Sequence, residues 1–494
     1  MNEINNKRYE SICDSCDQIL LENKANRVTI AIRWLHVLRW HPEYLKSYNY
    51  LFSNFKKNKK FKFQFGRFFR YFMVTCKNLL LSILSNKYWK SSHSLPKKID
   101  VLFISHLLTK NEVLHQNDFY FGAIADSLKS SGYSSSIVLI DHTSGFWGKN
   151  VSSWGKKNAN RLVLSKVLPF FDELKIYFSQ FKEFFRLKAN KVNFSGFQRE
   201  IVKEASFHAL SPSTSSNLRT AHQIKTLLKQ LEIKIIITTY EGQAWERLVF
   251  ATARDIMPNI KCVGYLNAGV FEFQHSLKRS LRELYDPNFI FTPGYISKVE
   301  LDGIYENTLI EVFGSNHFQK LNSIQSDYVT NKTCLIAPEG ILSECVIMFE
   351  YSILCAIQFP EVNFIWRLHP RLDFSEVFKF NLKLEKIPEN IVLSQNTLDK
   401  DLSSSTHILY RGSTVVVSSI THGLMPIYLK VKDELNIDPI YNCKYGRQVV
   451  EEVSDFKKAI DFNHSQSNKK YLEDFGKNFF IPFDTSVIEC ILKE

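Results

Sequence analysis

The sequence that decides the fold lies between residues 97 and 141, in KKIDVLFISH (97–106), DFYFGAIADSLKSSG (118–132) and SSSIVLID (134–141). The first and third segments are short apolar runs typical of buried strands, and the middle segment is typical of a helix that Gly132 closes. A strand, a helix and a second strand at this spacing predict the start of a parallel, doubly wound sheet. We therefore expect an α/β fold.

The same alternation continues towards the C-terminus and is interrupted once. Before the interruption, strands are predicted within residues 232–242, 260–269, 288–294 and 309–315. The interruption is QKLNSIQSDYVTNK (319–332), a polar, turn-rich segment typical of a hinge. After it, strands are predicted within residues 332–340, 362–370, 390–395, 406–412 and 425–430. The pattern predicts two Rossmann-like domains that face each other across a cleft. The first comprises residues 96–318 and includes a helical insert at 166–230, and the second comprises residues 319–494.

Residues 1–95 differ from the rest of the chain and are predicted to be helical, because they have few glycines and no alternating pattern. Between Tyr44 and Ile99 the sequence has thirteen Lys and Arg residues and no Asp or Glu. Within residues 56–84, apolar residues recur every three or four positions, which predicts an amphipathic helix. Such a helix can lie in the headgroup plane of an anionic membrane. A helix packed on its own domain, with a solvated basic flank, is the alternative.

The charge, the cysteines and the lengths of the apolar runs limit the kinds of partner and the cellular setting that we expect for this protein. The 494 residues carry a net charge of +13, and the acid-free stretch holds that excess, which argues against a nucleic-acid partner. The nine cysteines are scattered, as in a reducing cytosolic protein, and Cys13 and Cys16 lack a second pair of zinc ligands. No apolar run reaches the roughly 18 residues of a membrane span. We expect a cytoplasmic protein, peripheral on the inner face of the cytoplasmic membrane if the basic helix binds lipid.

Polar side chains follow most of the predicted strands. In open parallel sheets, ligands bind in the crevice outside the carboxyl ends of the strands. The ends in the first domain carry Tyr240-Glu241 and Asn267. Those in the second domain carry Glu339-Gly340, Arg367, His369-Pro370-Arg371 and Gly412-Ser413-Thr414. We expect the two edges to face each other across the hinge.

The His369 segment has the chemistry of a phosphate site. Pro370 ends the strand just after His369, so the imidazole is expected to project from the strand end. Arg367 and Arg371 flank it, and a histidine with cationic neighbours can bind a phosphate and stabilise charge on a leaving group.

The Gly412 segment points to the same chemistry. Gly412 permits close backbone approach, and Ser413 and Thr414 stand where a helix should begin. Hydroxyls and free amides at such a position can hold an anion. An ordinary N-cap is the alternative.

In their order and spacing, Glu339-Gly340, His369-Pro370 and Ser413-Thr414 resemble the acidic-Gly, His-Pro and Ser-Ser/Thr motifs of bacterial sialyltransferases and polysialyltransferases, and are similar to those of capsule-type Kdo transferases. The resemblance covers about the C-terminal half of the chain. It implies a GT-B fold and metal-independent transfer from a CMP-activated acid sugar to a surface polysaccharide or glycolipid acceptor. Pro338 is a departure, since the acidic motif often has two carboxylates.

The resemblance also implies roles for single residues. His369 would contact the donor phosphate and help the nucleotide leave, and Ser413 and Thr414 would hold that phosphate. The base that takes the proton of the acceptor hydroxyl would be Glu339 or, alternatively, Glu241.

The remaining assignments concern the acceptor, the ribose and metals. The acceptor would enter beside Tyr240, Glu241 and Asn267, and Asp438 would touch the donor ribose or cap a turn. No metal or cofactor is expected, since Asp399-Lys400-Asp401 opens a predicted helix and fits its dipole. Two other functions stay open, a CDP-polyol or other nucleotide-linked transferase and a noncatalytic glycan-assembly protein.

Overall fold

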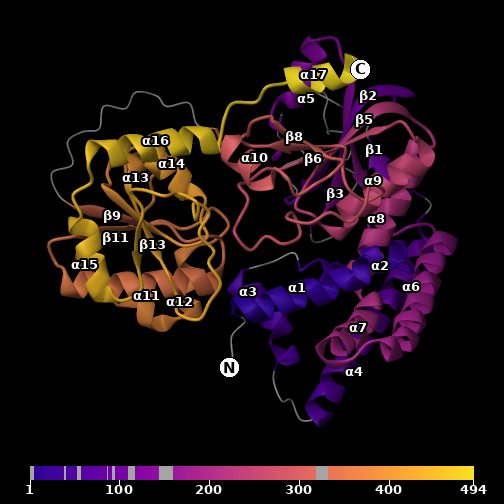
Figure 1. The fold of residues 1–494 in the computed structure, drawn as a ribbon, viewed down its shortest axis with the longest axis horizontal. Helices are drawn as coiled ribbons and strands as arrows, with labels where there is room; N and C mark the ends of the chain where they lie inside the picture. Colours follow the sequence, from indigo (N-terminus) through magenta and orange to yellow (C-terminus); the bar gives the residue numbers. More distant parts are fainter. Residues whose placement is uncertain are drawn as a thin grey trace.

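The structure is a computed structural model that describes residues 5–37, 41–52, 57–85, 87–91, 95–109, 117–143, 160–318 and 332–493, without the side chains of residues 57–65. Two parallel-sheet domains lie side by side, and a helical region lies beside the first of them (Figure 1). The predicted α/β fold class is therefore confirmed. Within the described ranges, no helix combines the length and the apolar composition that crossing a membrane requires.

The first domain is built on an eight-stranded sheet with the order β1-β4-β3-β2-β5-β6-β7-β8. Its strands are β1 (Trp89–Ser91), β2 (Lys98–Leu107), β3 (Ser135–Asp141), β4 (Asn160–Leu164), β5 (Glu232–Thr239), β6 (Lys261–Tyr265), β7 (Phe289–Thr292) and β8 (Leu309–Val312). Neighbouring strands are parallel except β1 and β4. The central strands β2 and β5 are buried along most of their length, which explains their nearly continuous apolar sequence.

Two strands of this sheet are missing from the sequence prediction. β1 lies within residues 1–95, which are predicted to be helical, and β4 comes just before the predicted helical insert. The two strands pair antiparallel with each other at the edge of the sheet, with Trp89 opposite Leu164. A strand of three residues is too short to show alternation, and β1 exists because β4 offers it an edge.

The N-terminal helices and the insert at 166–230 form one helical unit. The unit contains α1 (Asn6–Leu20), α2 (Arg27–Ala31), α3 (Pro42–Leu45), α4 (Lys57–Ile83), α6 (Phe170–Asn190), α7 (Gly196–Ala209) and α8 (Pro212–Leu228). Apolar side chains of α1 and α2, such as Ile12, Ile19 and Ile30, share one core with Ile201 and Val202 of α7. The first sheet domain adds α5 (Ile124–Ser130), α9 (Ala244–Ile256) and α10 (Tyr295–Leu301).

Helix α4 packs on this unit through its polar face. Arg67 pairs with Glu204 at 3.2 Å, and the side-chain amide of Asn78 donates to the hydroxyl of Tyr177 at 3.2 Å. The apolar face points away, and its most exposed side chains are Phe69, Phe72, Met73, Leu80, Ile83 and Leu84. The basic cluster at residues 56–62 lies outside the described side chains.

Helix α6 also exposes large apolar side chains, although it buries Ile176, Tyr177 and Leu187. Its buried face carries Glu173 and Glu183, which pair with Arg219 and Arg186. Its exposed face carries Phe171, Phe178 and Phe185, which are 73%, 66% and 61% exposed. The helical unit therefore presents apolar side chains to the outside on two helices that pack against each other.

The second domain contains a six-stranded parallel sheet with the order β11-β10-β9-β12-β13-β14. Its strands are β9 (Thr333–Ile336), β10 (Asn363–Trp366), β11 (Ile391–Leu393), β12 (His407–Tyr410), β13 (Met425–Leu429) and β14 (Gln448–Val450). The helices are α11 (Leu342–Gln358), α12 (Phe374–Phe380), α13 (Leu398–Ser403), α14 (Val415–Thr421), α15 (Val453–Asp461) and α16 (Gln466–Phe479). Because β10, β9 and β12 are neighbours, the loops that follow them meet at one edge of the sheet.

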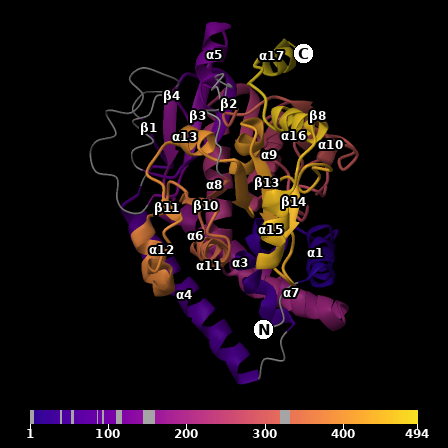
Figure 2. The same cartoon turned by 90° about the vertical axis from the view of Figure 1, so that its left-hand side faces the viewer.

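The last helix, α17 (Ser486–Lys493), returns to the first domain. Ile488 and Leu492 lie in the same core as Phe103 of β2 and Ile124 of α5, and Figures 1 and 2 both show α17 beside α5. This differs from the predicted division, which places residues 319–494 in one domain. A helix with one apolar face carries no sign in its sequence of which domain it covers.

Candidate functional site

Three loops converge at the carboxyl edge of the second sheet. Glu339-Gly340 follows β9, His369 follows β10 and Gly412 follows β12. A Cβ atom at residue 412 would lie 2.5 Å from Oε1 of Glu339, and one at residue 340 would lie 3.0 Å from Nδ1 of His369. Each glycine therefore provides the space that a neighbouring side chain occupies. The structure brings together the acidic-Gly, His-Pro and Gly412 segments.

The imidazole of His369 is half-buried beside Gly340. The backbone amide of Arg371 donates to Nδ1 at 3.2 Å, so the proton of the neutral ring is on Nε2. Burial lowers the pKa of His369, the positive charge of Arg371 lowers it further, and the carboxylate of Glu339 opposes both effects. A neutral His369 with its proton on Nε2 can donate a hydrogen bond to a phosphate oxygen.

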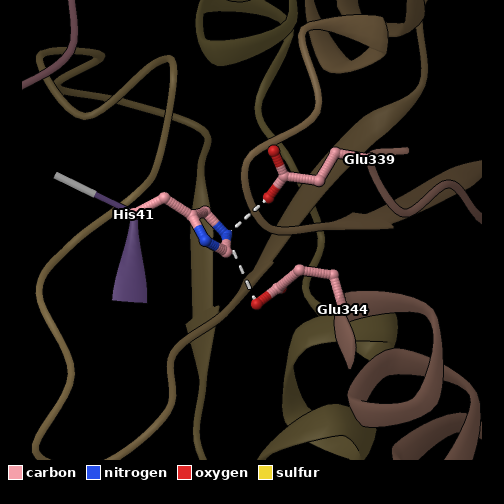
Figure 3. A group of neighbouring side chains, drawn as sticks. All are labelled: His41, Glu339 and Glu344. Atoms are coloured by element: carbon pink, nitrogen blue, oxygen red, sulfur yellow. Dashed lines mark ion pairs between the residues drawn. The ribbon is translucent and has the colours of Figure 1, made fainter. Parts of the chain in front are cut away.

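Glu339 is held by a side chain from the N-terminal helical unit. Nε2 of His41 lies 2.8 Å from Oε1 of Glu339 and 3.4 Å from Oε1 of Glu344 (Figure 3). His41 is only 6% exposed, whereas the side chain of Glu339 is 24% exposed. Burial alone would lower the pKa of His41, but its hydrogen bonds to Glu339 and Glu344 outweigh burial and raise the pKa to about 9.

The network continues to the Gly412 loop through Arg411. Nε of Arg411 lies 3.2 Å from Oε2 of Glu344, and its guanidinium also pairs with Glu434 at 2.5 Å. Arg411 is 1% exposed and Glu344 is 2% exposed. Buried charges are tolerated when they are paired, so this network links the loops that carry Glu339 and Gly412.

His41, Glu339 and Glu344 also meet the distance criterion of a metal site, because their ligand atoms lie within 4.8 Å of one another. However, Arg411 already places a positive charge beside Glu344, and a proton on His41 supplies a second one. The separation of 2.8 Å between Nε2 of His41 and Oε1 of Glu339 is that of a direct ion pair. We therefore interpret the cluster as an ion-pair network.

Arg367 and Asp438 lie in internal ion pairs. The sequence predicts that Arg367 contacts the donor and that Asp438 touches the donor ribose or caps a turn, and Oδ1 of Asp438 accepts from the backbone amide of Ile440 at 2.9 Å. Arg367 donates to Oδ2 of Asp401 at 2.7 Å, and Asp401 is fully buried. Asp438 is 1% exposed and pairs with Arg447. A buried carboxylate is stabilised by a charged partner, so both pairs have a structural role, and a contact of either residue with the donor stays a prediction. Asp401 therefore has a specific partner in Arg367, in addition to its favourable place in the first turn of α13.

The remaining predicted donor ligands lie on the same edge as Gly412 and His369. Pro370 and Arg371 are exposed, Thr414 is half-buried and Ser413 is 7% exposed. The predicted helix at residue 413 begins two residues later, with α14, and the Thr414 side chain caps none of the described amides. The hydroxyls of Ser413 and Thr414 stay candidate phosphate ligands.

The carboxyl edge of the first sheet contains a cavity of about 480 Å³. Glu241 and Asn267 line it; Glu241 is exposed and accepts a hydrogen bond from Gln243 at 2.7 Å. Oδ1 of Asn267 is buried without a partner in the described part of the chain. Tyr240 also lines the cavity, although its side chain is 1% exposed and packs on Phe250 in the core, and its contact with an acceptor stays a prediction.

Two histidines of this cavity are missing from the sequence prediction. Nδ1 of His106 lies 2.8 Å from Nε2 of His142, and Nε2 of His106 lies 3.0 Å from Oγ1 of Thr239. Burial lowers the pKa of His106 to about 3 and also lowers that of His142, so both rings are neutral at neutral pH. Because they end β2 and follow β3, the rule that selected Glu241 could have found them.

Comparisons with known proteins give only distant matches. No family model and no curated protein matches this sequence. Among solved structures, the UDP-GlcNAc 2-epimerase of Neisseria meningitidis bound to UDP-GlcNAc is 12% identical, over 80% of this chain and 100% of that chain, with a TM-score of 0.44.

Two further solved structures align in a similar way. MurG of Acinetobacter baumannii is 11% identical over 80% of this chain and 100% of that chain, with a TM-score of 0.43. The glycotransferase of kitacinnamycin is 9% identical over 78% of this chain and 95% of that chain, with a TM-score of 0.45. Matches at this distance assign neither a family nor a reaction, so the resemblance to sialyltransferases and Kdo transferases stays a prediction.

Proposed function

We propose that this protein is a glycosyltransferase that moves a Kdo-like or sialic-acid-like sugar from a CMP-activated donor to a surface polysaccharide or glycolipid acceptor. The observation that carries the proposal is the convergence of Glu339, His369 and Gly412 at one edge of the second sheet. Open parallel sheets bind their ligands at this edge. A carboxylate beside a neutral imidazole supplies a proton acceptor and a phosphate ligand, the two groups that metal-independent sugar transfer uses.

The donor phosphate binds beside His369, Arg371 and the hydroxyls of Ser413 and Thr414. Nε2–H of His369 donates to a phosphate oxygen, and Arg371 adds positive charge. When the bond between the anomeric carbon and the phosphate oxygen breaks, its electron pair stays on the phosphate, and CMP leaves. Donors that are already in place stabilise this developing charge most effectively.

Glu339 accepts the proton of the acceptor hydroxyl while the hydroxyl oxygen bonds to the anomeric carbon. Oε1 of Glu339 is buried against His41, which leaves Oε2 available to the acceptor. Glu241 is the alternative base, but it is exposed and bonded to Gln243. Glu339 lies beside His369 and Gly412 at the proposed phosphate site, whereas Glu241 lies in the cavity of the first domain. We therefore assign the base to Glu339 and the first-domain cavity to the acceptor.

Nucleotide binding and the His369→Ala variant test this proposal. We expect CMP to raise the unfolding temperature of the full chain more than UDP does. A rise with UDP alone would reject the CMP donor, and transfer only from CDP-linked polyols would favour the second nucleotide-linked reaction. His369→Ala should lower turnover from CMP-sugars at least about 100-fold while leaving folding intact, because the ring is half exposed. Unchanged turnover would reject the role of His369, and an absence of turnover by the natural protein with every nucleotide donor would favour a noncatalytic assembly protein.

We also propose that the helical unit binds an anionic membrane surface through the outer faces of α4 and α6. Both helices expose several large apolar side chains, although each also buries apolar residues such as Tyr71 and Ile176, and such exposed groups are unusual on a surface helix packed on its own domain. The stretch from Tyr44 to Ile99 has thirteen basic residues and no acidic residue, which fits anionic headgroups. Such a surface would place the protein near a lipid-linked acceptor.

Vesicle sedimentation tests the membrane proposal. Phe69→Ser with Phe72→Ser should weaken binding to anionic vesicles about tenfold or more, because each exposed phenylalanine contributes apolar burial. The matched control is Phe380→Ser with Leu382→Ser, two side chains of the second domain that are 59% and 67% exposed. Equal sedimentation of both double variants and the natural protein would reject the membrane surface.

A further inference from the structure

We propose that His41 is a positioning residue for Glu339, so that the N-terminal helical unit completes the site in the second domain; this inference rests on the proposed function. The direct observation is the distance of 2.8 Å between Nε2 of His41 and Oε1 of Glu339 (Figure 3). His41 comes from the segment just before α3, whereas Glu339 follows the first strand of the second sheet. The contact therefore joins two parts of the fold at the proposed base.

The ring of His41 is fixed from two further sides. The backbone nitrogen of Glu43 lies 3.2 Å from Nδ1, while Nε2 faces the carboxylates of Glu339 and Glu344. The ring also packs edge-on against Tyr44, with the ring centroids 5.7 Å apart. Because His41 is 6% exposed, a rotation of the ring would break these contacts. A side chain held this firmly can fix the orientation of its partner.

Removal of His41 would leave two carboxylates facing each other. The ligand oxygens of Glu339 and Glu344 lie within 4.8 Å, and of these two carboxylates it is Glu344 that pairs with Arg411. Without the donor between them, Glu339 loses its partner and is repelled by Glu344. We expect its carboxylate to turn away from the His369 side, which removes the oxygen that receives the acceptor proton.

A second contact between the same two elements supplies a control. The hydroxyl of Ser343 donates to Oε2 of Glu43 at 2.8 Å, close to His41 in sequence but without reaching Glu339. Ser343→Ala removes this hydrogen bond between the N-terminal helical unit and the second domain and leaves His41 in place. A loss of turnover in His41→Ala that Ser343→Ala does not reproduce therefore comes from the contact of His41 with Glu339, and not from a weaker contact between the helical unit and the second domain.

Steady-state kinetics of the full chain test the role in turnover. His41→Ala should lower kcat at least about tenfold with the donor KM changed less than about threefold. His41→Gln, whose amide nitrogen can still donate to Glu339, should recover most of that loss, and Ser343→Ala should match the natural protein. An unchanged kcat in His41→Ala, an equal loss in Ser343→Ala, or no recovery with glutamine would overturn the proposal.

A histidine NMR titration tests the contact without any substrate, with the His41 signal identified as the one missing in His41→Gln. The Glu339→Gln and Glu344→Gln substitutions together should move the titration of this signal to lower pH, since they remove both carboxylates. No shift, or broadening of the signal by Mn²⁺, would overturn the proposal in favour of a free ring or a metal site. If the natural protein transfers sugar from no nucleotide, the proposed function fails, and the titration still decides whether His41 holds Glu339.

Discussion

The two sheet edges occupy equivalent places in their domains but carry different chemistry. The first edge has a cavity of about 480 Å³ whose titrating pair, His106 and His142, is neutral. At the second edge, Glu339, His41 and Arg411 form a charged network beside His369. The first cavity also holds the charged side chains of Arg33 and Glu241, so the contrast lies in the histidines. The neutral pair of the first edge can bond to sugar hydroxyls, whereas the paired charges of the second edge suit a phosphate and a proton transfer. In the proposed function, the similar topology of the two sheets gives the positions of the acceptor and donor sites, and their different side chains give the two roles.

The largest expected effect separates the two candidate bases. Glu339→Gln should lower kcat about 1,000-fold, because a positioned general base contributes about 100- to 10,000-fold. Glu241→Gln should change kcat less than about tenfold, since this carboxylate is exposed in the first-domain cavity. Single-turnover kinetics with saturating donor measure both. The opposite order would move the base to the first edge.

The second effect concerns pH and the stability of the network. The folded-state pKa of His41 is about 9, above the ordinary value of 6.5. The network therefore contributes its full stability below pH 6.5 and loses it as the pH rises through about 9. The groups around the ring are Glu339, Glu344, Glu43 and Tyr44, with Arg411 behind Glu344.

The His41→Gln variant isolates this contribution. The difference in the free energy of unfolding between the natural protein and His41→Gln should fall by at most about 3 kcal/mol between pH 6.5 and pH 9. Urea unfolding at a series of pH values measures it, and the other histidines cancel because both proteins contain them. A difference that does not vary with pH would mean that His41 is not paired with the carboxylates.

The third effect sharpens the geometry of the second edge. In Gly412→Ala, the new Cβ would lie 2.5 Å from Oε1 of Glu339, so the carboxylate must move. We expect kcat to fall about tenfold, since small displacements of catalytic groups are costly. Gly66→Ala, whose Cβ meets no atom within 4 Å, should leave kcat unchanged. Full activity of Gly412→Ala would show that this close approach is dispensable.

The sequence predicts most of the fold because the strands that decide it are apolar over most of their length. β2 and β5 stand out in this way, whereas β1 has three residues and depends on β4, a partner that no local pattern reveals. The sequence likewise does not show that α17 packs on the first domain, because this contact joins residues far apart in the chain. Local sequence patterns predict which segments form helices or strands, whereas contacts between distant residues determine where short elements pack.

The candidate site divides in the same way. The positions of Glu339 and His369 follow from the rule that ligands bind at strand ends. The same rule also selects Arg367, but it cannot show that this guanidinium forms an ion pair with the buried carboxylate of Asp401. His41 follows no strand, and its partner lies in another domain, so only the three-dimensional structure shows it.

The smallest expected effect tests whether the first edge contributes stability through its neutral hydrogen bonds. Thr239→Val removes the hydroxyl that lies 3.0 Å from Nε2 of His106 and should lower the free energy of unfolding by about 1 kcal/mol. Thr238→Val is the matched control, since Thr238 is fully buried and its hydroxyl has no partner in the described ranges. This change should be neutral or stabilising, because it removes an unsatisfied group. Equal losses in urea unfolding would mean that the His106 contact adds nothing beyond the shape of the side chain.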